Sequence, residues 1–85
     1  MTTMEELKQA CELLDQINDD TSIPRNIRRN ASECKELLLN SDDEIDVRIA
    51  SSIFKLEVMA DDPNIPLHGR TMIWNIISRL ESIKN

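Results

Sequence analysis

Two short segments carry the side chains whose types and spacing could do chemistry. Each holds a pair of aspartates, then a proline and an arginine, at the same spacings. The members are Asp19, Asp20, Pro24 and Arg28 in the first segment and Asp61, Asp62, Pro66 and Arg70 in the second. Carboxylates and guanidinium groups placed in this way could hold a cation, hold an anion, or pair with one another across a turn.

A metal site at the aspartate pairs is disfavoured. A calcium loop takes several oxygen ligands at regular spacing with a glycine at its sharp turn, and neither segment supplies that arrangement. Zinc needs four ligands at short paired spacings, whereas this chain has two separate cysteines, Cys11 and Cys34, and one histidine. Aspartates that accept backbone hydrogen bonds in turns explain the same residues. We therefore predict no metal and no cofactor.

The arginines stand where positive charge is unfavourable. Arg25, Arg28 and Arg29 fall in the first turns of a predicted helix, where the partial positive charge of the helix end makes a cation unfavourable by about 0.3 to 1 kcal/mol. An ion pair between each repeated arginine, Arg28 or Arg70, and the aspartates of its own segment would offset this cost. Because the arrangement recurs at the same offset, we expect these internal pairs as a structural motif.

The alternative for the arginines is an external anion. A phosphate or a partner's carboxylate could be held by the helix N-terminus together with guanidinium groups. This candidate anion patch consists of Arg25, Arg28, Arg29 and His68. His68 could also serve as a general base, but no nucleophile and no orienting carboxylate accompany it in a catalytic motif. We predict that the protein is not an enzyme.

The elements that must position these residues are helices related by an internal repeat. The offset that relates the two segments (61 − 19 = 42) also relates Leu14 to Leu56 and Leu38 to Leu80. A period of about 40 residues is typical of stacked helix pairs. We expect an all-α fold of four helices as two tandem helical hairpins, either a short right-handed superhelix or a HEAT-like bundle. The chain would form a single domain, 1–85, with internal repeats at about 1–42 and 43–85.

Capping signals and prolines set the expected helix ends. Thr3 with Glu6, and Ser41 with Glu44, have the spacing of a capping box. Each repeated proline suits the first turn of a new helix. The predicted helices run from about Met4 to Asn18, from Pro24 to Leu39, from Asp42 to Ala60 and from Pro66 to Lys84.

Apolar residues spaced three and four apart predict the buried face of each helix. The stripes outside the third helix are Met4, Leu7, Cys11, Leu14 and Ile17, then Ile27, Ala31, Cys34 and Leu38, and finally Ile73, Ile76, Ile77, Leu80 and Ile83. The two cysteines lie in these stripes, so we expect buried free thiols. Gly69 is unfavourable inside a helix by about 1 kcal/mol relative to alanine, and a close approach of helices would explain it.

The third helix is apolar on most of its circumference. One stripe is Ile45, Ile49, Ile53, Leu56 and Met59, and a second is Val47, Ala50, Phe54 and Val58. Such a helix needs cover on two sides, so we expect it at the centre of the core; a subunit interface along Phe54 is the alternative. Trp74 falls at the edge of the last stripe and is a second candidate for partner contact. The candidate interface is therefore Phe54, Val58 and Trp74.

Composition limits the function classes. The net charge is −6, which disfavours nucleic acid without ruling out a local basic patch. No apolar run approaches the roughly 18 residues of a membrane span, and acidic residues occupy the start of the chain, where a secretory signal carries positive charge. We expect a cytoplasmic protein with no membrane contact.

Two resemblances follow from the repeated segments. Residues 27–31, with the pattern Ile-Arg-x-x-Ala, resemble HEAT repeats, although the usual spacing between aspartate and arginine is absent. Residues 19–29, 61–68 and 73–76 are similar to the signature segments of uncharacterised archaeal protein family 0147, and this similarity spans essentially the whole chain. It implies a small helical cytoplasmic protein of archaeal type, with no assigned activity, substrate or cofactor.

The function expected from these observations is a non-enzymatic protein-interaction module. Its partner would be an unknown protein or a second copy in a homodimer, which would cover the extra apolar stripe and stabilise a small core. The alternative is an accessory binder of nucleic acid or a phosphate ligand through Arg25, Arg28 and Arg29.

Overall fold

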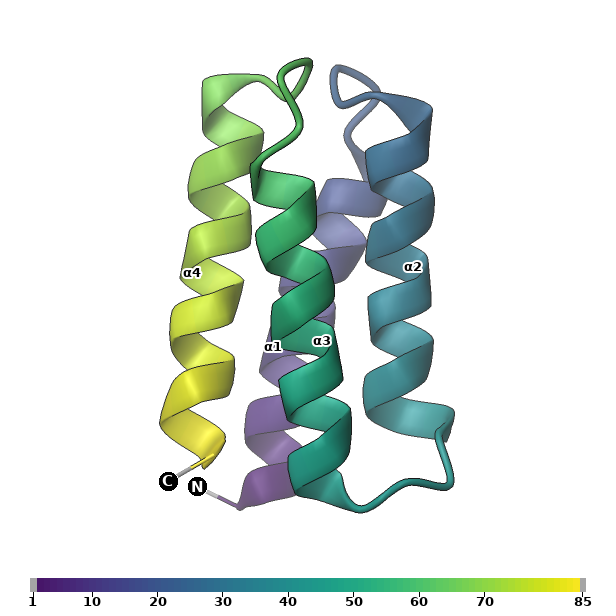
Figure 1. Ribbon diagram of the computed structural model, residues 1–85, viewed down its shortest axis with the longest axis vertical. Coiled ribbons are helices and arrows are strands. Elements are labelled where there is room, and N and C mark those ends of the chain that lie inside the picture. Colours follow the sequence, from purple (N-terminus) through teal and green to yellow (C-terminus); the bar gives the residue numbers. More distant parts are fainter. Residues whose placement is uncertain (1, 85) are drawn as a thin grey trace.

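The computed structural model describes residues 2–84, and the side chains of residues 2–83. It contains four helices: α1 (Thr3–Asp19), α2 (Arg25–Asn40), α3 (Ile45–Ala60) and α4 (Leu67–Lys84). The helices run alternately up and down, with the α1–α2 and α3–α4 turns at one end and the α2–α3 connection at the other (Figure 1). No strand occurs in residues 2–84. The all-α prediction of two helical hairpins is confirmed.

The helices form a closed ring. α1 lies beside α2 and α4, and α3 lies beside the same two helices; within the described residues no Cα atom of α1 comes within 8 Å of one in α3, and none of α2 within 8 Å of one in α4. A HEAT-like stack would instead place α1 on α3 and α2 on α4, so the HEAT-like part of the prediction is not confirmed. The expectation that α3 is the centre of the core is wrong, because each helix occupies one corner of the ring (Figure 1).

One face of each helix fills the space inside the ring. The predicted stripes of α1, α2 and α4 are buried, except that Met4 is 53% exposed and Ile83 is only partly buried. Both exceptions lie at the end of the bundle that holds the chain termini, where neighbouring helices give less cover. In α3 the first stripe is buried at Ile49, Leu56 and Met59. Its second stripe lies outside, because a ring of four helices buries only one face of each.

Two predicted capping boxes differ from the structure. The N-cap of α1 is Thr2, whose Oγ1 accepts a hydrogen bond from Glu5 N at 3.2 Å, so the box lies one residue before the predicted one. Helix α3 begins at Ile45 after a cap without a side-chain bond. Ser41 Oγ instead accepts from Asp43 N at 3.1 Å. This local turn competes with the helix for the serine hydroxyl and delays the helix start.

Close packing explains Gly69, although the predicted close approach of two helices is not its cause. A Cβ atom at this position would lie 3.1 Å from Ile65 Cγ1 and 3.3 Å from Ile23 Cδ1. The crowding therefore comes from side chains of the two turns.

Cys11 and Cys34 are buried free thiols, as predicted. Within the described part of the chain, every helix is too short or too polar to cross a membrane.

Candidate functional site

The repeated aspartates build two matching turns. Asp20 Oδ1 accepts hydrogen bonds from Ser22 N at 2.9 Å and from Ser22 Oγ at 2.6 Å. At the equivalent place, Asp62 Oδ1 accepts from Asn64 N at 2.8 Å. Each carboxylate therefore folds its own turn. The other members of the pairs, Asp19 and Asp61, are exposed, and no group of three or more metal-ligating side chains occurs among the described residues.

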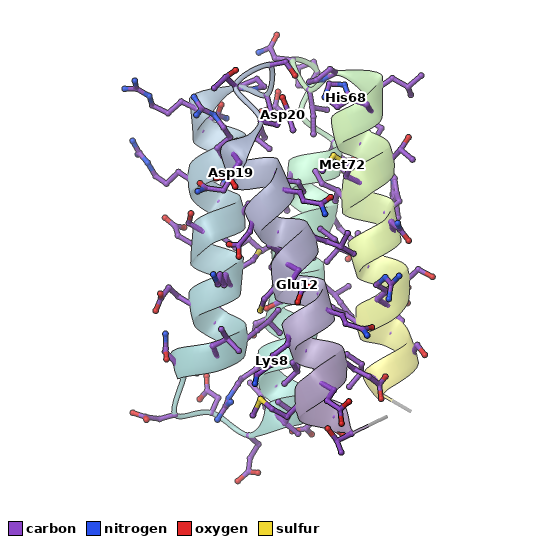
Figure 2. The ribbon with its side chains drawn as sticks, turned by 180° about the vertical axis from the view of Figure 1, so that it is seen from behind. Lys8, Glu12, Asp19, Asp20, His68 and Met72 are labelled. Atoms are coloured by element: carbon purple, nitrogen blue, oxygen red, sulfur yellow. The ribbon has the colours of Figure 1, made fainter. Side chains whose placement is uncertain are left out.

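The two turns also hold each other. His68 Nε2 at the start of α4 lies 2.9 Å from Asp20 Oδ2 in the first turn. Asn26 Nδ2 at the start of α2 donates to Asp62 Oδ2 in the second turn at 3.3 Å. Asn26 and His68 are themselves separated by the repeat offset (68 − 26 = 42). The contacts are thus reciprocal, and they join the two hairpins at the end of the bundle where both turns lie (Figures 1 and 2).

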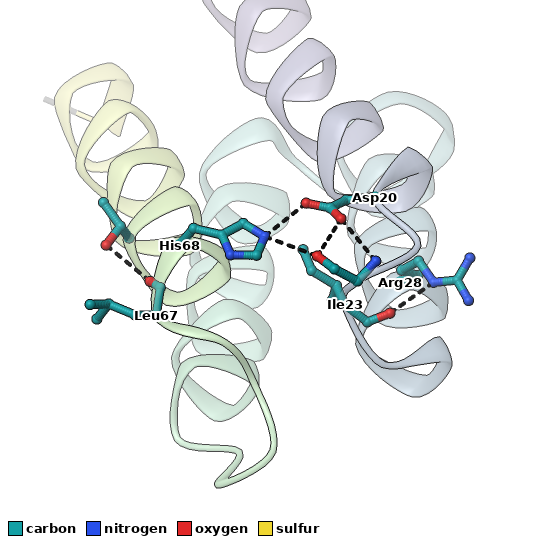
Figure 3. Close-up of polar contacts among 7 residues, drawn as sticks. Asp20, Ile23, Arg28, Leu67 and His68 are labelled. Carbon is teal, nitrogen blue, oxygen red and sulfur yellow. Dashed lines mark hydrogen bonds and ion pairs between the residues drawn. The ribbon is translucent and has the colours of Figure 1, made fainter.

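The Ser22, His68 and Asp20 cluster is not arranged as a catalytic relay. Hydrogen bonds lower the pKa of the Asp20 carboxyl. The largest contribution comes from the Ser22 hydroxyl, followed by His68 and the Ser22 amide. An ionised carboxylate only accepts, so His68 Nε2 carries the hydrogen and the Ser22 hydroxyl donates to Asp20 (Figure 3). A relay needs the serine on one ring nitrogen and the aspartate on the other. Here both lie at Nε2, the serine at 3.2 Å.

The expected ion pairs of the repeated arginines are not formed. Arg28 Nε donates to Ile23 O at 3.0 Å, and Arg70 Nε donates to Ala60 O at 2.9 Å. The Arg70 guanidinium also reaches Asp62 O at 3.3 Å, the backbone oxygen and not the carboxylate. Carbonyls at a helix end or in a turn lack partners within the helix, so they accept the guanidinium groups. The prediction located the right segments but the wrong acceptor atoms.

The candidate anion patch does not converge on one point. Arg25 and Arg29 are exposed. Arg28 and His68 lie on opposite sides of the first turn (Figure 3).

The repeated prolines stand just before α2 and α4. Pro24 O accepts from Arg28 N at 3.1 Å, and Pro66 O accepts from Arg70 N at 3.1 Å. Backbone bonds therefore fix both helix starts.

Large apolar side chains gather on the outside of the second hairpin. The three candidate interface residues are all exposed: Phe54 by 68%, Val58 by 58% and Trp74 by 49%. Two further residues were not among the candidates, Leu67 and Val47, which are exposed by 75% and 46%. We call these five residues the apolar face. Val47 could have been found from its place in the second stripe of α3, whereas Leu67 gives no signal beyond its position after Pro66.

The first hairpin has no such face at the same positions. The residues 42 positions earlier are Glu5, Glu12, Gln16, Arg25 and Ser32. All five are polar and exposed. The two hairpins share their turns and their helix contacts, so the architecture itself does not require apolar residues there. The apolar face is a property of the second hairpin alone.

These features define the class: a small antiparallel four-helix bundle built from two repeated hairpins whose turns hold each other. The family model described as Uncharacterised protein family (UPF0147) matches residues 1–83. The chain belongs to this family, and its homologues are archaeal.

Relatives and solved structures agree with this assignment. A UPF0147 protein of Methanosarcina acetivorans is 48% identical over 79 residues, which cover 93% of this chain and 81% of that protein. One of Archaeoglobus fulgidus is 51% identical over 77 residues, covering 91% and 87%. The crystal structure of the unknown function protein MMP1188 has a TM-score of 0.92 and 44% identity over 99% of this chain and 96% of that one. A UPF0147 structure from Thermoplasma acidophilum has a TM-score of 0.88 and 36% identity over 94% of both.

Proposed function

We propose that this protein is a non-enzymatic interaction module that binds another protein through the apolar face. The observation that carries this proposal is the difference between the two hairpins. At five equivalent exposed positions the first hairpin has polar residues and the second has apolar ones. Large exposed apolar patches on a protein surface mark interaction sites, and these five residues lie on the outside of one hairpin.

The size of the effect supports binding. Full burial of a side chain such as Phe, Leu or Val contributes about 1.5 to 3 kcal/mol. Phe54, Val58 and Trp74 are exposed by 68%, 58% and 49%, so a partner would gain roughly 1 to 2 kcal/mol from covering each one. Tryptophan is also enriched among the residues that dominate protein interfaces. Three such residues on adjacent helices therefore offer a partner a hydrophobic contact.

The non-enzymatic part of the proposal rests on the polar cluster at the turns. Its groups satisfy one another: Asp20 accepts from Ser22 and His68, and Asn26 donates to Asp62. A hydroxyl that donates to a carboxylate is not activated as a nucleophile by the neighbouring imidazole. The cluster supports a structural role in joining the hairpins.

A capture experiment with matched variants tests the proposal. The tagged protein is used as bait in native-source lysate, with and without nuclease, and bound proteins are identified by mass spectrometry. The test variant carries the residues of the first hairpin, Phe54→Glu with Val58→Gln. The control exchanges the equivalent residues of the first hairpin, Glu12→Gln with Gln16→Glu, and thus alters exposed positions on the same two turns of the equivalent helix.

We expect a nuclease-resistant partner that the wild type and the control variant both capture and that the test variant does not. The purified partner should also bind the purified wild-type protein. Circular dichroism of each variant confirms that the fold is intact. Equal retention of every partner by the test variant would contradict the proposal. Loss of all partners after nuclease would instead favour a nucleic-acid role for the arginines.

A further inference from the structure

Three lines of side chains run along the outer half of α3. A helix turns by about 100° per residue, so residues 7 or 11 apart lie almost on one line along it. The acidic line is Asp46 and Glu57, the apolar line is Val47, Phe54 and Val58, and the basic line is Arg48 and Lys55. The apolar line lies between the two charged lines, about 90° from each.

Contacts within the bundle show which way each line faces. Lys55 Nζ lies 2.8 Å from Glu33 Oε1 of α2, so the basic line is on the α2 side of α3. The acidic line is on the opposite side, toward α4, and Phe54 points away from the bundle with 68% of its surface exposed. Figure 1 shows α3 in front, between α4 and α2.

This charge pattern matches itself in one orientation. When a second copy faces the first with α3 parallel to α3, the acidic line of each copy lies opposite the basic line of the other. When the two helices are antiparallel, acidic residues face acidic residues and basic residues face basic ones. Opposite charges across an interface fix its orientation, and like charges oppose the wrong one. The parallel arrangement is therefore the favoured one.

We propose that the apolar line of α3 binds a second copy of this chain, in a dimer whose two-fold axis is parallel to α3. The proposal rests on the proposed function and names the partner.

Two single cysteine variants test the orientation. Val47→Cys and Val58→Cys lie 11 residues apart on α3, about 16 Å along its axis. A disulfide needs Cα atoms within about 7 Å. Only an axis parallel to α3 lets each variant cross-link to its own copy at both positions. Gln16→Cys, the repeat equivalent of position 58, is the matched control, and wild-type Cys11 and Cys34 are buried.

We expect a dimer in sedimentation equilibrium, homotypic cross-links for both variants, and none for Gln16→Cys. Phe54→Glu should weaken association by more than about tenfold, the effect of losing one interface anchor. A monomer at every concentration, or cross-links no more frequent than those of the control, would overturn the proposal. Cross-linking only in a mixture of the two variants would overturn the parallel orientation and hence the proposal.

The same experiments separate this inference from the proposed function. A monomeric protein that still captures a different partner through Phe54 and Val58 would refute the dimer and leave the interaction module intact. A protein that neither self-associates nor captures any partner through these residues would refute both.

Discussion

Ser52 gives a sharp test of the packing inside the ring. It is fully buried on α3, and its Oγ has no hydrogen-bond partner. Its repeat equivalent in α1 (52 − 42 = 10) is Ala10, also fully buried. The two hairpins thus place a hydroxyl and a methyl group at the same position of the same core. We expect Ser52→Ala to stabilise the protein.

The magnitude follows from the buried hydroxyl. A buried polar group without a partner costs about 1 to 3 kcal/mol, and alanine is a better helix former than serine by a few tenths of a kcal/mol. Ser51→Ala is the matched control, because Ser51 is exposed and its change reports helix propensity alone. We expect a gain of about 1 to 2 kcal/mol for Ser52→Ala beyond that of the control. Ala10→Ser should destabilise by a similar amount.

Urea denaturation monitored by circular dichroism measures these differences. An unchanged slope m of the unfolding free energy against urea concentration shows that the folded and unfolded states are otherwise the same. In a domain of this size a gain of 1 kcal/mol raises Tm by about 4 to 8 °C. A Ser52→Ala protein less stable than the Ser51→Ala control would refute the reasoning. It would mean that the Ser52 hydroxyl makes a stabilising hydrogen bond in the folded protein.

Three further predictions concern other buried or bonded groups. Burial raises the pKa of Cys11 to about 11 and that of Cys34 to about 12, so neither thiol should react with a disulfide reagent at pH 8 until urea unfolds the chain; immediate reaction would contradict their burial. The hydrogen bond from the Ser22 hydroxyl is the main cause that lowers the pKa of Asp20. The stability that this carboxylate contributes is therefore present above its unfolded pKa of about 3.9, and it is lost as pH falls through the lower pKa of the folded state. Ser22→Ala should raise the carboxyl midpoint measured by NMR, and an unchanged midpoint would refute this cause. Gly69→Ala should fail to deliver the about 1 kcal/mol that alanine normally adds to a helix, because the new Cβ would lie 3.1 Å from a buried isoleucine; a full gain in urea stability would show that the site is not crowded.

Helix content and the inner faces could be predicted because they depend on local patterns. The stripe of α2, from Ile27 to Leu38, is buried at every predicted position, since a helix with one apolar face has one way to bury it. The pattern of α3 was ambiguous for the same reason. Two apolar stripes specify two covered faces, and a single sequence does not distinguish cover by the same chain from cover by another.

The arginines show a second limit. Arg28 and Arg70 were located correctly in repeated turns, yet their acceptors are the carbonyls of Ile23, Ala60 and Asp62. Every residue has a carbonyl, so residue types do not indicate which one accepts. The contact between His68 and Asp20 spans 48 positions and depends on how the hairpins pack. Long-range polar contacts of this kind follow from the fold and are not written in either segment alone.

The internal repeat separates what the fold requires from what it does not. Where both hairpins have polar residues at equivalent positions of the turns, the structure shows a shared structural role: Asp20 and Asp62 each fold a turn, and Asn26 and His68 each reach the opposite turn. Where the hairpins differ at equivalent exposed positions, the fold tolerates either residue, so its stability does not explain the choice. The exposed apolar residues of α3 and α4 belong to this second group, and this difference between the hairpins is what supports the proposal that they bind a partner.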